Sequence, residues 1–248
     1  MKTKSILLIL AAAILMASCS MNDQNAKNNN LSVVGSGNMV SQTRSLSGFD
    51  SLEAGLHFDL TIHQGEDFKV VLFSDDNFID YIQVEKLGTT LSFGLKDGYA
   101  YNISNVTLRA EVTMPDLAGL ELNGSSQATL DGFKSTGDLQ VELTGSSLLD
   151  GSMEADKSSF VLSSSTYLKL GGSAESLWVD ACGNSVVDLS GYRAEEAALD
   201  VSCASETVVN VAGKLDVEAS QNSRVFYIED PGYGEINVYQ HAFVGLKQ

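Results

Sequence analysis

From Leu120 onward, the chain repeats one pattern of apolar and polar positions. Each copy has an apolar–x–apolar triplet, four mostly small or polar residues, and a second segment in which apolar residues alternate with others. Alternation with a period of two predicts a β-strand, and Gly, Ser and Asn between two such segments predict a tight turn. Each copy is therefore predicted to be a strand–turn–strand unit. Taking the first apolar residue as position zero, the copies begin at Leu120, Val141, Phe160, Val179, Val201, Val217 and, in a degenerate form, Val238.

The spacing of these repeats, 16 to 22 residues, leaves no room for a crossover helix. Each repeat presents an apolar face that it cannot bury alone, whereas stacked repeats bury these faces against one another. We therefore predict an all-β fold, a parallel β-helix or a closely related β-solenoid. With about 4.8 Å between neighbouring strands, seven coils would form a rod section about 30 Å long.

A hydroxyl side chain recurs at position +6 of six repeats. In stacked coils these side chains would form one column at an inward corner, each bonding to a neighbouring hydroxyl or a backbone carbonyl. We interpret the column as a structural ladder, and the alternative is a hydroxyl-lined groove for a ligand. The predicted ladder is Ser126, Ser147, Thr166, Ser185, Thr207 and Ser223.

Residues 31–119 are also rich in strand patterns but are less regular. Apolar residues alternate over residues 52–62, and residues 82–95 resemble a hairpin around Leu87-Gly88-Thr89. Residues 75–82 are the one helical candidate, and they resemble a turn. Because no linker separates this part from the repeats, we predict one domain over residues 31–248, with the N-terminal section capping an end of the solenoid.

The N-terminus has the pattern of a lipoprotein export signal. Lys2 and Lys4 precede an apolar run over residues 6–17, which is too short to span a bilayer as a helix. The run ends in Leu-Met-Ala-Ser-Cys, which resembles a lipobox, so we expect residues 1–18 to be removed and Cys19 to be lipidated. The alternative is an ordinary secretory signal with a chance Cys. Residues 19–30 would then be the lipidated Cys and a flexible tether, because they are polar and rich in Asn.

These features predict an outer-membrane lipoprotein of the cell envelope, whose acyl chains bind the membrane. The sequence leaves open whether the protein faces the cell surface or the periplasm. The formal net charge of −17 argues against nucleic acid as a partner and against polyanions held by broad electrostatic attraction. No cofactor is expected.

An outward column of acidic residues is the candidate for a metal site. Position +1 holds Glu121, Glu142, Val161, Asp180, Ser202 and Glu218. Oxygen-rich clusters suit Ca²⁺, which makes Glu121, Glu142, Asp180 and Glu218 weak calcium candidates. No calcium-binding loop motif accompanies them, so a solvated anionic face is the favoured interpretation and no metal is predicted.

The histidines and cysteines give no clear site. His57, His63 and His241 lack a zinc-binding spacing and are expected at the surface, with His57 and His63 on one face of a strand. Cys182 and Cys203 fall on adjacent coils, where a disulfide is possible in an oxidising compartment. We favour Cys203 as a small core residue and Cys182 as a turn residue, because their Cβ atoms would diverge.

Trp178 and Tyr192 are expected to point outward. An exposed aromatic ring can serve as a platform for a sugar or can pack under a long turn. Packing is the favoured interpretation of both residues.

Several segments together resemble the GIN-domain family, the auto-transporter adhesin head domain. They are GSGNMVSQTRSLSGFDSLE at 35–53, LTIHQGEDFKVVLFSDDNFIDYIQVE at 60–85, LSFGLKDG at 91–98 and MPDLAGLELNGSSQATLDGF from Met114. The resemblance covers residues 33–248 and implies a right-handed β-solenoid head with an adhesion-like role and no catalytic residues.

We therefore expect a non-enzymatic binding or scaffolding protein whose partner is a glycan or a cell-surface protein. One alternative is a carbohydrate-active enzyme, a polysaccharide lyase or hydrolase, since many β-solenoids belong to those classes. Another is a periplasmic scaffold or envelope-stress component. The Arg and Lys residues that a lyase would use on uronates are scattered and do not fall on neighbouring coils.

Overall fold

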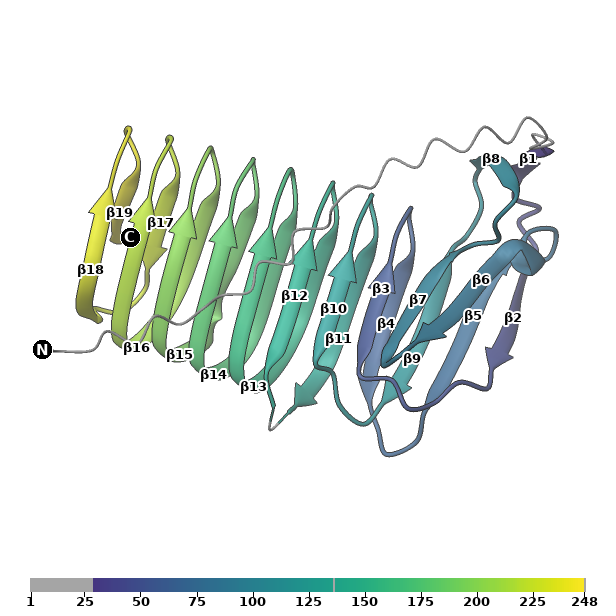
Figure 1. Cartoon of the computed structure of the whole chain (residues 1–248), viewed down its shortest axis with the longest axis horizontal. Helices are drawn as coiled ribbons and strands as arrows, with labels where there is room; N and C mark the ends of the chain where they lie inside the picture. The colour runs from purple at the N-terminus through teal and green to yellow at the C-terminus, as the bar shows by residue number, and fades with distance from the viewer. Residues whose placement is uncertain (1–28, 136, 248) are drawn as a thin grey trace, which may run out of the picture.

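The protein is a rod of stacked β-coils that is closed at its N-terminal end by antiparallel strands (Figure 1). The structure, a computed structural model, describes residues 29–135 and 137–247. The predicted signal peptide, the predicted lipid attachment at Cys19 and most of the predicted tether lie outside the described residues. Within those residues, no helix has the length and apolar character needed to cross a membrane.

The N-terminal part of the rod contains nine strands and one short 3₁₀ turn. The strands are β1 (Asn29–Val34), β2 (Met39–Arg44), β3 (Ser51–Ala54), β4 (Asp59–Gln64), β5 (Lys69–Asp75), β6 (Ile82–Leu87), β7 (Thr90–Leu95), β8 (Tyr99–Ser104) and β9 (Arg109–Met114), and the turn is η1 (Ile79–Tyr81). The turn falls within the predicted helical candidate at residues 75–82.

The remaining strands form the regular coils. They are β10 (Gly119–Leu122), β11 (Gln127–Lys134), β12 (Leu139–Leu143), β13 (Leu148–Leu162), β14 (Tyr167–Ala181), β15 (Val186–Val201), β16 (Glu206–Ala219), β17 (Arg224–Tyr227), β18 (Gly232–Val238) and β19 (Phe243–Leu246). The four long strands, β13 to β16, each contain the second half of one coil and the first half of the next.

Two parallel ladders run along the rod, and the predicted parallel β-solenoid with an N-terminal cap is confirmed. The first ladder joins β7, β3, β10, β12, the C-terminal halves of β13 to β16, and β18. The second ladder joins β9, β4, β11, the N-terminal halves of β13 to β16, β17 and β19. Apolar side chains from both ladders meet in one continuous core, as expected for coils that bury their faces against one another.

The cap adds antiparallel strands to both ladders. β6 pairs with β7 through the predicted hairpin, in which Gly88 has a φ of 61°, and β5 pairs with β9 and with β2. These strands cover what would otherwise be an open end of the stack, which agrees with the predicted role of the N-terminal section. β1 and β8 form a separate parallel pair.

The repeat begins earlier than the sequence predicted. β3, a tight turn and β4 form a coil in which Leu52 pairs with Leu120 of the next coil. Between β4 and β10 the chain forms β5 to β9, of which β7 and β9 extend the two ladders beyond β3 and β4. This insertion, residues 65–118, separates the first copy from the others and hides the repeat in the sequence.

Two predicted repeats were placed two residues too late. Val179 pairs with Leu199, and Val217 pairs with Ile236, so Leu199 and Ile236 take position zero in place of Val201 and Val238. The error arose because Leu199, Val201 and Cys203 share one parity, so the alternation continues into the turn. The corrected copies begin 21, 19, 19, 20, 18 and 19 residues apart, which is more uniform than predicted.

Each coil changes ladder through a four-residue turn whose second residue has a positive φ. Gly145 and Gly183 take this position with φ of 77° and 82°, and Ser164 and Cys203 take it with 75° and 63°. The turns also stack: the Asn184 N–H donates to the Ser164 carbonyl at 2.6 Å. The stacked backbone therefore continues the parallel ladders around the corner.

The fourth turn residue forms the hydroxyl file. It holds Ser126, Ser147, Thr166, Ser185, Ser205 and Ser223, all buried. The prediction of Thr207 in this file was wrong, because the register shift moves Ser205 into it. Thr207 instead pairs with Val187 and Val225 along the second ladder.

Some of the hydroxyl groups in this file donate hydrogen bonds to backbone carbonyls. Ser147 Oγ donates to the Thr144 and Leu122 carbonyls at 2.7 and 3.1 Å, and Ser223 Oγ donates to the Val201 carbonyl at 2.8 Å. Thr166 Oγ1 donates to Ser185 Oγ at 3.0 Å, and Ser185 Oγ donates to the Cys182 carbonyl. Within the described chain, the hydroxyls of Ser126, Ser205 and Thr207 have no hydrogen-bond partner.

A buried carboxylate joins two loops of the cap. Asp75 is 3% exposed and accepts hydrogen bonds from the Gly37 N–H at 2.7 Å and from the Thr107 N–H at 2.9 Å. The Thr107 bond, and then the Gly37 bond, lower the pKa of this carboxyl below its ordinary value. The neighbouring Asp76 accepts from Ser36 Oγ at 2.6 Å and Asn38 Nδ2 at 2.7 Å.

Candidate binding face

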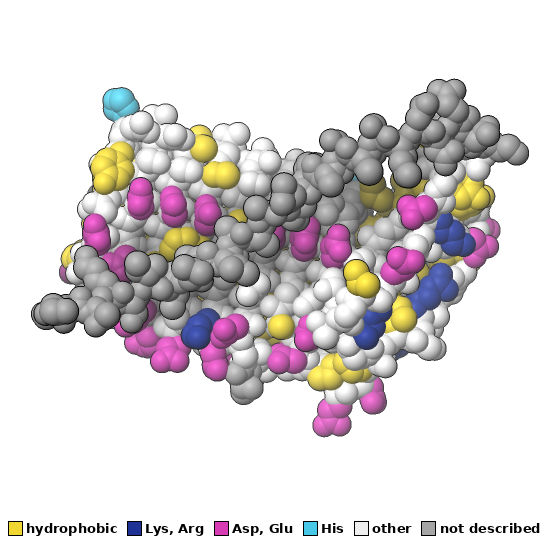
Figure 2. All heavy atoms as spheres, in the orientation of Figure 1, with side chains coloured by type: hydrophobic (Ala, Val, Ile, Leu, Met, Phe, Trp, Pro, Cys, Tyr) yellow, Lys and Arg dark blue, Asp and Glu magenta, His cyan; other side chains and the backbone are white. Residues whose placement is uncertain are grey.

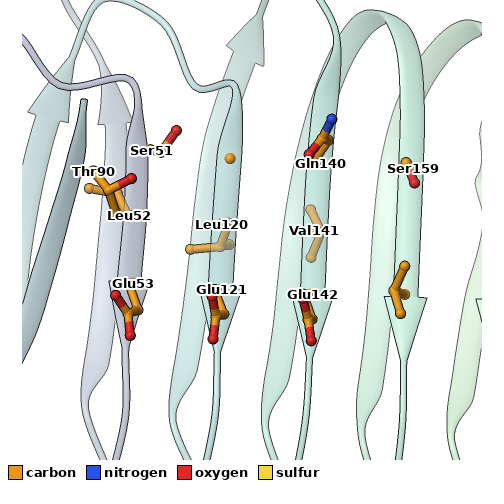
Figure 3. Close-up of a pocket in the computed structure, with 12 residues that line it drawn as sticks. Ser51, Leu52, Glu53, Thr90, Leu120, Glu121, Gln140, Val141, Glu142 and Ser159 are labelled. Atoms are coloured by element: carbon orange, nitrogen blue, oxygen red, sulfur yellow. The ribbon is translucent and has the colours of Figure 1, made fainter. Parts of the chain in front are cut away.

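The outer face of the first ladder carries a file of carboxylates, and we call this surface the acidic face. Strand residues that follow position zero point away from the core, and parallel pairing places them next to one another on successive coils. Figure 3 shows Glu53, Glu121 and Glu142 pointing the same way from adjacent strands. In register order the file is Glu53, Glu121, Glu142, Val161, Asp180, Asp200, Glu218 and Asn237.

This order corrects the predicted column at one position and extends it at another. Asp200 stands where Ser202 was expected, because of the register shift, and Ser202 lies in the turn. Glu53 adds an acid at the cap end. Val161 divides the file into a group of three acids and a second group of three.

Crowding on the face alters the ionisation of two carboxyls. Burial raises the pKa of Glu121, and the charges of Glu53 and Glu142 raise it further. Burial also raises the pKa of Asp180, with Asp200 contributing. The face therefore holds its negative charge at a free-energy cost, which a cationic or hydrogen-bond-donating ligand would relieve.

A second row of outward side chains runs beside the acids. It consists of the residues that precede position zero, most of which are small or neutral: Ser51, Gly119, Gln140, Ser159, Trp178, Ala198 and Asp216. A shallow hollow of about 240 Å³ lies along these rows, and its lining includes Gly119, Gln140 and the acids Glu53, Glu121 and Glu142 (Figure 3). The two rows form a polar track along the rod axis.

Charge is unevenly distributed over the molecule. Figure 2 shows Asp and Glu side chains along much of the visible face, whereas most of the visible Lys and Arg side chains lie near the cap end. The chain has 32 Asp and Glu residues against 15 Lys and Arg residues. The chain therefore carries a large excess of negative charge.

The calcium candidates lie in the file but not around one point. Glu121 and Glu142 are direct neighbours, whereas Asp180 and Glu218 are separated from each other by Asp200. Among the described residues, no group of three or more His, Cys, Asp or Glu side chains is arranged to hold a metal ion.

The histidines expected to share a strand face lie in different elements. His57 lies in the first tight turn, before β4 begins, so its predicted place on the strand was wrong. His63 lies on β4 and its Nδ1 is 3.0 Å from Asp131 Oδ2. His57 and His63 therefore do not form a shared site.

Both cysteines of the repeat region lie in turns. Cys203 was predicted in the core, but it takes the second turn position with positive φ, and its Sγ donates to Gln221 Oε1 at 3.4 Å. The shift of register explains the error. Cys182 takes the first turn position, as expected, and burial raises the pKa of its thiol. The Cys182 and Cys203 thiols are both free.

The two aromatic residues differ in environment. Trp178 points outward and is 43% exposed. Tyr192 was also predicted to point outward, which is wrong: it is fully buried, its ring packs on Phe160, and its hydroxyl is 2.6 Å from Ser158 Oγ. Tyr192 belongs to the bend between the ladders, where the strict alternation of the strands is interrupted.

The stacked coils define the class of this molecule as a β-solenoid. The chain belongs to the family described as "Putative auto-transporter adhesin, head GIN domain", whose profile matches residues 48–231. Among curated proteins, none matches the chain.

Several solved structures share the fold. A putative adhesin from Bacteroides fragilis NCTC 9343 has a TM-score of 0.79 and 15% identity, over 87% of this chain and 100% of that chain. A putative lipid binding protein from Parabacteroides distasonis ATCC 8503 has a TM-score of 0.69 and 17% identity, over 88% and 100%. A putative adhesin from Parabacteroides merdae ATCC 43184 has a TM-score of 0.68 and 13% identity, over 88% and 99%. These relatives are named as adhesins or a lipid-binding protein and not as enzymes.

Proposed function

We propose that the protein is a non-enzymatic, lipid-anchored binding protein of the cell envelope that holds an extended glycan along its acidic face. The observation that carries the proposal is the in-register track of carboxylates beside small and amide side chains. Membership of an adhesin head family supports a binding role. The predicted lipobox at Cys19 supports attachment to a membrane.

A glycan suits this track better than a compact ligand. Carboxylates and amides accept or donate hydrogen bonds to hydroxyls, and successive coils repeat these groups about every 4.8 Å along the rod. A polymer of repeated sugar units can contact several coils at once. Because the face is anionic, the glycan must be neutral or cationic, and polyuronates are expected to be repelled.

The arrangement favours binding over hydrolysis. In glycoside hydrolases two carboxyl groups flank the scissile bond, one on each side. Glu53, Glu121 and Glu142 instead point the same way from neighbouring strands of one ladder (Figure 3). A ligand lying on this surface would meet the three carboxylates from the same side.

A glycan array probed with the purified protein tests the binding role. We expect retention on neutral or cationic glycans, and weaker retention for Glu121→Gln/Glu142→Gln. Asp150→Asn/Asp188→Asn, on the second ladder, is the matched control with an equal change of charge and should bind as the parent does. A reducing-sugar assay on each retained glycan distinguishes the enzyme alternative, because turnover would contradict a non-enzymatic role.

Labelling cells with an alkyne-tagged fatty acid tests the membrane anchor. The parent should incorporate the label and Cys19→Ser should not. Protease treatment of intact cells then separates the two orientations: digestion indicates the cell surface, and protection indicates the periplasmic face, where a scaffold role would be the better interpretation.

A further inference from the structure

A second and larger hollow lies on the acidic face around Trp178. Its volume is about 580 Å³, and the C-terminal halves of β14 to β16 and β18 line it. Trp178 has Ser159 and Ala198 as its in-register neighbours. Because both side chains are small, the indole ring stands clear of its row and has room beside it for a flat ligand. Gly234 of β18 also lines the hollow and lies directly against the side chains of Asp216 and Lys214.

The lining of this hollow is acidic around the ring. Asp200, Asp216, Glu218 and Glu235 contribute carboxylates, and Lys214 Nζ pairs with Asp216 Oδ2 at 2.5 Å. Asp216 also accepts a hydrogen bond from the Glu235 N–H. Within the described part of the chain, Asp200 and Glu218 form no salt bridge. The lining therefore keeps free negative charge next to an aromatic surface.

These features call for a ligand with both a flat apolar face and a positive charge. An aromatic ring attracts cations and packs against the C–H face of a sugar. Carboxylates bind an ammonium group through charge-assisted hydrogen bonds. Burial and the nearby Asp200 already raise the pKa of Asp180, so an arriving cation would relieve repulsion at this end of the file.

We propose that the Trp178 hollow is a subsite for a hexosamine unit with a free amino group, with the sugar ring on Trp178 and the ammonium group between Asp200 and Glu218. This inference rests on the proposed glycan-binding function and names the class of sugar. A basic peptide would satisfy the carboxylates but would leave the aromatic platform without a flat partner. An N-acetylated sugar would stack on the ring but would leave the carboxylates without a cation.

Tryptophan fluorescence of the full chain in detergent tests the subsite. Trp178 is the only tryptophan in the sequence, so its emission reports on this hollow alone. We expect a saturable change of emission with a glucosamine hexamer, and affinity at least about tenfold weaker with the N-acetylglucosamine hexamer, because the charge-assisted contact is lost. Asp200→Asn should weaken binding of the glucosamine hexamer, and Asp150→Asn, on the opposite ladder, should not.

Calorimetry on Trp178→Ala supplies a readout that does not depend on the indole. Loss of affinity for the glucosamine hexamer supports the subsite, and unchanged affinity overturns it while leaving the proposed function intact. Equal binding of both hexamers overturns the assignment of a free amine. If hexalysine matches the glucosamine hexamer in affinity and in its effect on emission, the assignment of a sugar to the hollow is wrong. If no glycan binds to the parent at all, the proposed function itself fails.

Discussion

Adjacent residues on one strand of the solenoid experience opposite environments. On β12, Leu143 is fully buried and Glu142 stands on the acidic face. Leu143→Asp should destabilise the protein by about 3–5 kcal/mol, because it places an unpaired carboxylate in the core. Glu142→Ala should change stability by less than about 0.5 kcal/mol. Chemical unfolding of both variants measures the difference, and equal effects would contradict the assignment of inward and outward positions.

The buried carboxylate of the cap makes a different prediction. Asp75→Asn replaces one of the two oxygens that accept from the Gly37 and Thr107 N–H groups with an NH2 donor, and should destabilise the protein by about 1–3 kcal/mol at pH 7. Glu66→Gln, in an exposed loop, is the control and should have little effect.

The effect of Asp75 should depend on pH in a defined direction. Its pKa is lowered by folding from the ordinary value of 3.8, so its contribution is complete above that value and is lost as the pH falls through the folded pKa. The difference in free energy of unfolding between the parent and Asp75→Asn, measured from pH 7 to pH 3, should decrease only at the acid end of this range. A difference in free energy of unfolding that is constant over the whole range would contradict the role of Asp75 as a charged hydrogen-bond acceptor.

The stacked turns are sensitive to a single added methyl group. At Gly183 the φ is 82°, and a Cβ atom would lie 2.4 Å from the Ser164 carbonyl oxygen of the preceding turn. Gly183→Ala should therefore destabilise the protein by about 1–3 kcal/mol. Ser164→Gly, at the same turn position one coil earlier, should stabilise it by less than about 1 kcal/mol, because the positive φ then costs nothing. Thermal unfolding compares the two, and a harmless Gly183→Ala would show that the turns do not stack this closely.

The contribution of Glu121, on the acidic face, to stability should depend on pH in the opposite direction to that of Asp75. Because folding raises the pKa of Glu121, the charged form is disfavoured in the folded state, and the penalty is relieved as the pH falls through the raised value. Glu121→Gln should stabilise the protein by a few tenths of a kcal/mol at pH 7, and this gain should disappear near pH 4. Added salt should reduce the gain as well. A destabilising Glu121→Gln would show that Glu121 forms a favourable contact and is not crowded by like charges.

For the molecule as a whole, the sequence predicted the architecture better than the register. Alternation and short repeat spacing were sufficient for a parallel β-solenoid, because few folds can bury one apolar face per 20 residues without helices. The register of two coils could not be settled in the same way. Leu199 and Val201 are equally apolar and have the same parity, and the choice between them depends on which residue pairs with Val179.

The candidate face was predicted in part for the same reason. Glu121, Glu142, Asp180 and Glu218 follow directly from the repeat, whereas Glu53 was missed because a long insertion separates its coil from the others. Leu52-Glu53-Ala54 matches the triplet of the later copies, so the signal was present in the sequence. The environment of Tyr192 could not be predicted, because it lies at a bend where alternation fails.

Pulsed electron paramagnetic resonance between spin labels on the acidic face tests the in-register file most directly. Cysteines introduced at Glu53 and at Asp180, Asp200 or Glu218, in a background without Cys19, Cys182 and Cys203, supply the labelled pairs. The distances should increase by about 4.8 Å per coil and reach about 29 Å for the pair from Glu53 to Glu218. Distances that do not increase in the order of the coils would contradict the single file, and with it the track on which the proposed binding depends.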